Sequence, residues 1–106
     1  MGAGAWNEAF QKADDLLSKL SVEQKASLLT GTFAGSCNGN IGAIESVGFP
    51  GLCLEDGPLG IRLADLANTF PAGLTTAASW DKNLMYVRGQ ALGSEFRGKG
   101  AHVMTG

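Results

Sequence analysis

The stretch that decides the fold runs from Gly51 to Arg62 and reads Gly-Leu-Cys-Leu-Glu-Asp-Gly-Pro-Leu-Gly-Ile-Arg. Its apolar residues, 52–54, are bracketed by a Pro-Gly and a Gly-Pro pair, so they are predicted to form a short buried strand. Glu55 and Asp56 follow at the carboxyl end of this strand. Parallel α/β folds hold ligands at such ends, which makes an acid there a candidate site residue. Asp before Gly-Pro is also what a plain Asx-turn contains, and the local sequence leaves both interpretations open.

Two helices are predicted before this strand. Apolar residues recur at spacings of three and four from Trp6 to Leu20, which is typical of an amphipathic helix. Ser21 followed by Gln24 forms a capping-box pattern, so a second helix is expected from residue 22 to about residue 30. Gly31 is expected to end it in a left-handed conformation.

Between these helices and the strand, residues 31–48 are rich in Gly, Ser and Asn. Asn38-Gly39 is a turn signal, and no periodicity is sustained, so a surface loop is predicted. After Arg62, residues 63–67 are expected to form one helical turn.

Cys37 and Cys53 are the two cysteines of the chain. Paired, they would close a loop of about 16 residues, worth roughly 3 kcal/mol in the chain-entropy model. Unpaired, Cys53 would be a small core residue. The residues alone leave both states open. Two cysteines and one histidine are too few for a zinc site, and no metal or cofactor is expected.

A third helix is predicted to start at Ser79 or Asp81, which are both N-cap residue types, and to run to Arg97 before Gly98. Gly89 and Gly93 lie inside it. Each interior glycine costs about 1 kcal/mol relative to alanine, so the pair predicts a close approach to a neighbouring element, interpreted as the sheet.

Residues 101–104 are predicted to form a second strand. Together the elements describe two leading helices followed by one βαβ unit, which is an α/β fold. The 106 residues suffice for one small domain.

Composition argues against two classes of partner. The net charge is −2 and the basic residues are scattered, so neither nucleic acid nor an anionic membrane surface is expected as a partner. No apolar run reaches the eighteen or so residues of a membrane span, and the first five residues lack the features of a signal peptide.

Four ordered blocks of sequence carry a resemblance to a known family: Gly48–Asp65, Thr69–Gly73, Ala77–Met85 and Glu95–Gly100. Their residues, order and spacing resemble the N-terminal segment of the glycoside hydrolase family 3 β-glucosidases, especially the fungal ones. The resemblance covers nearly the whole chain, from about Trp6 to Gly106.

The resemblance implies that the chain is the opening of a (β/α)8 TIM barrel. Residues 1–5 would be an N-terminal tail, and residues 6–106 the N-terminal part of the barrel domain. A closed barrel needs about 250 residues, so this segment would leave apolar helix faces and strand edges uncovered. Marginal stability and self-association through those faces are expected of the isolated chain.

The activity implied by the resemblance is retaining hydrolysis of terminal, non-reducing β-D-glucosyl residues, with a β-glucoside or cello-oligosaccharide as substrate. Retention requires a carboxylate nucleophile and a carboxylic acid/base about 5 Å apart. In the family both come from further downstream, so the 106-residue chain alone is expected to be inactive. A stand-alone sugar-binding or protein-interaction module derived from the same segment is the alternative.

Asp56 matches the family's aspartate that binds hydroxyls of the glucose ring, and Arg62 matches an arginine that either lines the same pocket or forms an ion pair. Glu55 stands where related sequences often carry Gln, and it is left out of the site. His102 stands where Asn is more usual, and a structural role is favoured over a general base. The cysteines match a loop and strand pair of secreted members, which implies a Cys37–Cys53 disulfide and an extracellular location.

Overall fold

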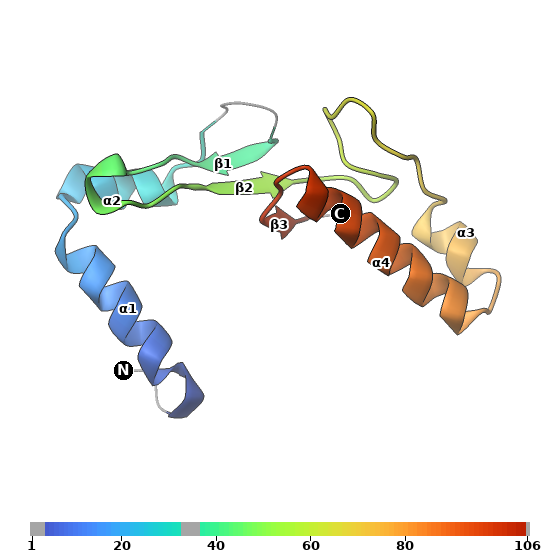
Figure 1. Cartoon of the computed structure of the whole chain (residues 1–106), viewed down its shortest axis with the longest axis horizontal. Coiled ribbons are helices and arrows are strands. Elements are labelled where there is room, and N and C mark those ends of the chain that lie inside the picture. The colour runs from blue at the N-terminus through green and yellow to red at the C-terminus, as the bar shows by residue number, and fades with distance from the viewer. Residues whose placement is uncertain (1–3, 33–36, 106) are drawn as a thin grey trace. The chain divides into compact units, whose positions relative to one another are not determined.

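The computed structural model describes residues 4–32 and 37–105 (Figure 1). The chain divides into two compact units, one made of residues 1–31 and 41–51 and the other of residues 32–40 and 52–106. Residues 1–3 of the expected tail lie outside the described part of the chain, and Gly4 already begins a short helix.

The first unit is built from short helices: η1 (Gly4–Trp6), α1 (Asn7–Ser18), α2 (Val22–Leu29) and η2 (Glu45–Val47). The capping box predicted at the start of α2 is confirmed. The Ser21 hydroxyl accepts the Gln24 backbone N–H at 3.2 Å, and the Gln24 side-chain oxygen accepts the Ser21 N–H at 2.9 Å. The Gln24 amide also donates to the Ser46 hydroxyl at 3.0 Å, which ties α2 to η2.

The end of α2 differs from the prediction. Thr30 has extended backbone angles (φ −99°, ψ 112°), and Gly31 is not among the residues with positive φ. The chain therefore leaves the helix through an extended residue, and the left-handed stop expected at Gly31 is wrong. Leu20 and Ile44 are the buried apolar side chains described for this unit.

The second unit contains, apart from Ile41, a three-stranded sheet of β1 (Gly39–Ile41), β2 (Leu52–Glu55) and β3 (Val103–Met104), in the order β1-β2-β3. Strands β2 and β3 are parallel, with Leu54 opposite Val103. The connection between them contains α3 (Gly73–Ala77) and α4 (Lys82–Gly98), seen in orange and red in Figure 1. The predicted βαβ unit is therefore present. Its strand β3 is shorter than expected.

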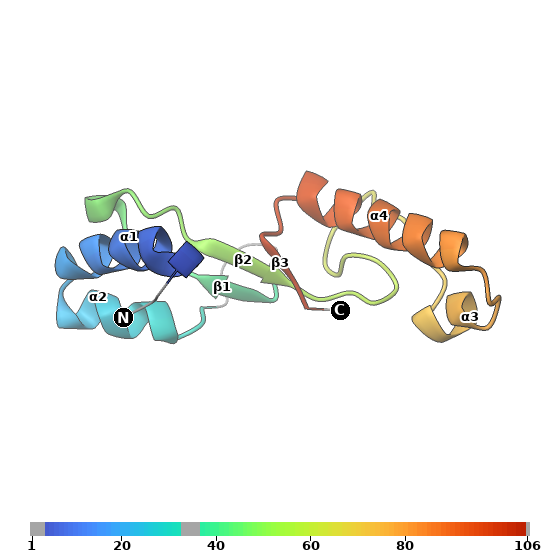
Figure 2. The same cartoon turned by 90° about the horizontal axis from the view of Figure 1, so that it is seen from below.

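Helix α4 carries the core of the second unit. The Asp81 carboxylate accepts the N–H groups of Asn83 and Leu84 at 2.9 and 3.1 Å, so Asp81 rather than Ser79 is the N-cap. Leu92 and Phe96, one turn apart, are each only 2% exposed. Figure 2 shows the short helix α3, which the sequence did not predict, beside the first turns of α4.

The interpretation of the α4 glycines is wrong for this chain. A Cβ placed on Gly89 or Gly93 would meet nothing within 4 Å, so no described neighbour approaches either one closely. The predicted stop is also displaced. Gly98 is the last residue of the helix, and Gly100 is the residue that takes the left-handed conformation, with φ +85°.

The long loop between β2 and α3 is tied to α4. The Arg88 guanidinium donates to the carbonyls of Pro58 and Pro71, and the Glu95 carboxylate accepts both the backbone and side-chain N–H of Asn68 at 2.9 and 2.7 Å.

The helical turn predicted at residues 63–67 is absent. Leu63 and Leu66 are left-handed instead (φ 53° and 54°), which no helix tolerates.

The loop predicted over residues 31–48 contains more structure than expected, although residues 33–36 lie outside the described part. Strand β1 and helix η2 both fall within it. Gly39 begins β1 rather than completing a turn, because Asn38 is held by contacts to the end of β2.

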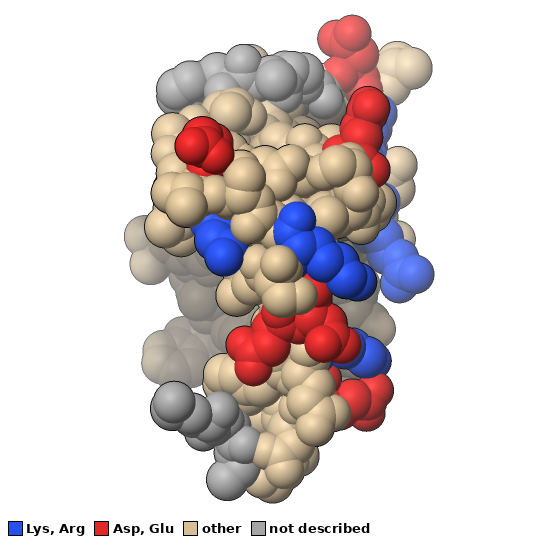
Figure 3. Space-filling view, turned by 90° about the vertical axis from the view of Figure 1, so that its left-hand side faces the viewer, with Lys and Arg blue, Asp and Glu red and all other residues tan. Residues whose placement is uncertain are grey.

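On the surface, acidic and basic side chains lie near one another among uncharged ones on the face drawn in Figure 3. In α1, Lys12 Nζ lies 2.6 Å from Glu8 Oε1, and both side chains are mostly exposed. None of the described helices is both long and apolar enough to cross a membrane.

Candidate functional site

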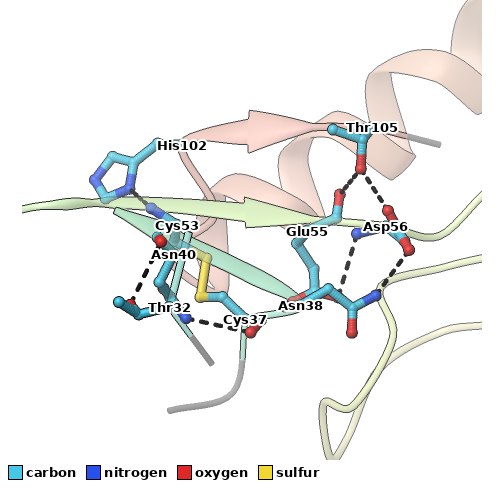
Figure 4. The surroundings of a disulfide bond; sticks show 9 residues. All are labelled: Thr32, Cys37, Asn38, Asn40, Cys53, Glu55, Asp56, His102 and Thr105. Carbon is cyan, nitrogen blue, oxygen red and sulfur yellow. Dashed lines mark hydrogen bonds between the residues drawn. A yellow bond between two sulfur atoms is a disulfide. The ribbon is translucent and has the colours of Figure 1, made fainter. Parts of the chain in front are cut away.

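Two consecutive carboxylates lie at the carboxyl end of β2 (Figure 4). Glu55 is the last residue of the strand and is 1% exposed. Asp56 follows it, and its side chain retains 42% exposure. This difference agrees with the alternation of side chains along a strand, which directs neighbours to opposite faces. Of the two, only Asp56 can reach a ligand from solvent.

The Asp56 carboxylate is held by three donors, two of them distant in the sequence and one, Arg62, six residues on. Thr105 donates its hydroxyl to Oδ1, the Asn38 side-chain amide donates to Oδ2 at 2.8 Å, and Arg62 Nη1 lies 3.1 Å from the same Oδ2. The Arg62 side chain is 58% exposed, so this ion pair contributes at most about 1 kcal/mol. Both predicted site residues are thus brought together.

The number of donors limits what Asp56 can still bind. An ionised carboxylate has about four lone-pair positions, and three are engaged here. One further hydroxyl can therefore be accepted directly. A second would have to replace one of the present donors, and the Arg62 side chain, which is 58% exposed, can move into water to make room.

These contacts also change the acidity of Asp56. The hydrogen bond from Thr105 and then that from Asn38 lower the pKa of this carboxyl below its ordinary value. Burial opposes them, and the charge and hydrogen bond of Arg62 add smaller lowering effects. Asp56 is therefore ionised, and an acceptor only, at neutral pH. In that state it suits a ligand rich in hydroxyl donors.

Glu55, which the sequence analysis left out, is part of the same arrangement. Its two oxygens accept the backbone N–H of Asn38 at 2.9 Å and that of Asp56 at 3.2 Å. Asn38 and Thr105 were also not anticipated. One sequence feature indicates such partners: Glu55 stands at the end of a strand predicted to be apolar and buried, and a buried charge requires hydrogen-bond partners.

Cys37 and Cys53 form a disulfide, with an S–S distance of 2.04 Å and a Cα–Cα distance of 5.6 Å. The pairing implied by the resemblance is present. Since Cys37 directly precedes Asn38, the bond fixes the chain entering Asn38 against β2.

His102 makes two hydrogen bonds with the backbone of β2. Its Nδ1 accepts the Cys53 N–H at 2.9 Å, while its own backbone N–H donates to the Cys53 carbonyl at 2.9 Å. The ring thus continues the pairing of β2 with the chain entering β3. Because Nδ1 acts as an acceptor, it carries no proton in this arrangement.

A pocket of about 340 Å³ lies beside the site, and its lining includes Glu55, Arg62, Asp65 and Lys99 but not Asp56. Among the described residues, Cys37, Cys53 and Glu55 place potential metal-ligand atoms within 4.8 Å of one another. Both sulfurs are bonded to each other, so this group offers no thiolate to a metal.

The whole chain, rather than the site alone, is similar to one class of protein. The chain matches the N-terminal portion of fungal β-glucosidases, which confirms the resemblance found in the sequence. No protein-family model matches the chain.

Among the similar proteins, the probable beta-glucosidase G of Aspergillus flavus is 55% identical over 105 residues, which are 99% of this chain and 13% of that protein. The probable beta-glucosidase A of Aspergillus niger is 47% identical over 107 residues, with 99% and 12% covered. This chain therefore spans about an eighth of the length of these relatives.

Solved structures agree with the sequence comparison. Beta-glucosidase D2-BGL from Chaetomella raphigera superposes with a TM-score of 0.82 at 46% identity, covering 98% of this chain and 15% of that one. Beta-glucosidase 3B from Thermotoga neapolitana, solved in complex with glucose, superposes with a TM-score of 0.79 at 26% identity, covering 90% and 16%.

Proposed function

We propose that residues 6–106, preceded by a short tail, form the first part of a family 3 glycoside hydrolase barrel. We also propose that the enzyme to which this segment belongs is a secreted, retaining β-glucosidase. The match to fungal β-glucosidases supports this proposal, as does a disulfide of the kind found in oxidising compartments.

Within that enzyme, Asp56 binds hydroxyls of the terminal glucose ring and Arg62 lines the same subsite. The observation that carries this role is an ionised, partly exposed carboxylate fixed by three donors at the carboxyl end of β2. A carboxylate that accepts a sugar hydroxyl favours the sugar that supplies that hydroxyl over an epimer lacking it. The relative solved with glucose is consistent with a glucose subsite.

Neither catalytic carboxylate is assigned to these 106 residues. Glu55 is buried and its oxygens are engaged by backbone N–H groups, and the lowered pKa of Asp56 does not suit a proton donor, so these two carboxylates do not supply the acid and nucleophile that retention requires. The chain alone is expected to show no hydrolysis of an aryl β-glucoside above an Asp56→Ala control. Activity that disappears with Asp56 would contradict this assignment.

A hybrid enzyme tests the role of the segment directly. In it, this chain replaces the matching 105 residues of the Aspergillus flavus relative. The hybrid should hydrolyse aryl β-glucosides. In the hybrid, Asp56→Asn should lower kcat/KM roughly a hundredfold, the effect of losing about 3 kcal/mol of hydrogen bonding to a charged group.

The matched control is Asp14→Asn, the same substitution on the exposed face of α1, which should leave kcat/KM unchanged. A fully active Asp56→Asn hybrid would exclude Asp56 from the sugar subsite.

A further inference from the structure

Glu55 is the most deeply buried charged side chain in the described part of the chain, at 1% exposed. Removing an ionised carboxylate from water is costly unless hydrogen bonds compensate for the lost hydration. Both of its oxygens do accept hydrogen bonds, one from the Asn38 N–H at 2.9 Å and one from the Asp56 N–H at 3.2 Å. The partners are backbone groups, so the side chain fixes the course of two chain segments.

Both of these segments determine where Asp56 lies. One contact holds the backbone of Asp56 itself. The other holds Asn38, whose side-chain amide donates to Asp56 Oδ2 at 2.8 Å. Figure 4 shows Asn38 lying between the two carboxylates, bonded to one through its backbone and to the other through its side chain. The disulfide at Cys37 secures the same loop from the preceding residue.

We propose that Glu55 is a positioning residue for Asp56, acting through the Asn38 backbone to orient the carboxylate that receives the sugar. The inference rests on the proposed role of Asp56 in sugar binding. It assigns Glu55 no contact with substrate and no proton transfer, because its oxygens are occupied and shielded from solvent.

If Glu55 had only a structural role, it would stabilise the end of β2 without changing the pKa of Asp56. The titration of Asp56 separates the two roles, because the Asn38 hydrogen bond is one of the causes of its lowered pKa. Arg62 and Thr105, the other groups that face Asp56, are unchanged in every variant used. The side-chain carboxyl carbon of Asp56 is followed by NMR through an acid titration of the full 106-residue chain.

In Glu55→Ala, the Asn38 backbone is released, and the pKa of Asp56 should rise towards that of an ordinary aspartate. In Glu55→Gln, the side-chain carbonyl still accepts an N–H, so the pKa should remain closer to that of the parent chain. Glu45→Ala, which removes an exposed glutamate of the other unit, is the matched control and should leave the titration unchanged.

Asn38→Ala keeps the backbone contact to Glu55 and removes only the side-chain donor to Asp56, so it tests the link even where Glu55→Ala fails to fold. The pKa of Asp56 should rise here too. An unchanged Asp56 titration in Asn38→Ala, or in a folded Glu55→Ala chain, would overturn the proposal.

The hybrid enzyme supplies the second readout. Glu55→Ala should lower kcat/KM and Glu55→Gln should restore most of it. The Asp56→Asn hybrid reports on sugar binding independently. If that variant is fully active while the titrations behave as expected, the sugar subsite is wrong and the positioning of Asp56 stands.

Discussion

At the scale of single residues, Gly57 illustrates why the motif after β2 requires glycine. Its φ is +146°, and a Cβ there would lie 1.8 Å from the Gly60 carbonyl oxygen. Gly57→Ala should therefore destabilise the chain by about 1–3 kcal/mol, the usual cost of a strained backbone conformation, and more if the loop cannot shift. Urea unfolding measures the change.

Gly93→Ala is the matched control for that substitution. Gly93 lies within α4, and a Cβ there would meet nothing within 4 Å. Alanine should stabilise the helix by about 1 kcal/mol relative to glycine. The two replacements should therefore have opposite signs, and equal effects would contradict the described course of the loop at Gly57.

The acidity of Asp56 predicts a pH dependence of stability. Because its pKa is lowered on folding, mainly by Thr105 and Asn38, its contribution is complete above the ordinary aspartate value of about 3.9. That contribution is lost as the pH falls through the lower, folded-state pKa. Asp56→Asn should flatten this part of a plot of unfolding free energy against pH, whereas Asp14→Asn should not.

At the scale of elements, the disulfide joins the loop before β1 to β2. It spans a separation of 16 residues, for which the chain-entropy model gives about 3 kcal/mol. Replacing both Cys37 and Cys53 with serine should lower the free energy of unfolding by roughly that amount. Reducing the disulfide of the parent chain should lower the free energy of unfolding by a similar amount. A reduced chain as stable as the oxidised one would contradict this estimate.

The elements also show what the sequence could predict. Strand β2, the capping box of α2 and the extent of α4 follow from local patterns and were expected within a few residues. The left-handed Leu63 and Leu66 were not expected, because their conformation depends on a loop tied to α4 through side chains more than fifteen residues away.

Some residues of the candidate site could likewise be predicted from the sequence, and others could not. Asp56, Arg62 and the cysteine pair came from the resemblance, since a single sequence cannot distinguish a ligand carboxylate from an Asx-turn. The contact of Asn38 with Glu55 joins residues 17 apart, and that of Thr105 with Asp56 joins residues 49 apart. Neither pairing leaves a periodic signal in the sequence, so the hydrogen bonds that join Glu55 and Asp56 to these residues could not be predicted from it.

At the scale of the whole molecule, large apolar side chains are exposed in both units. Trp6 is 69% exposed and Leu29 90% in the first unit, and Leu74 is 83% and Trp80 90% in the second. Apolar surface of this extent favours association. The isolated chain should therefore have a light-scattering mass that rises with concentration above the 10.9 kDa of a monomer.

Its thermal unfolding should also be broad, because few side chains form a core in either unit. A concentration-independent monomer with a sharp, cooperative transition would contradict both expectations. That result would favour the alternative of a self-sufficient sugar-binding or interaction module.

The parallel pairing of β2 with β3 has a consequence for the order of folding. His102 contacts Cys53 at a sequence separation of 49, so the entropy of closing that long loop must be overcome before any β3 contact forms. Helix α4 and the 16-residue cysteine loop involve nearer neighbours and should form first. Docking of β3, which supplies Thr105 to Asp56, is then the late step, so the carboxylate acquires its final orientation only once the last strand is in place.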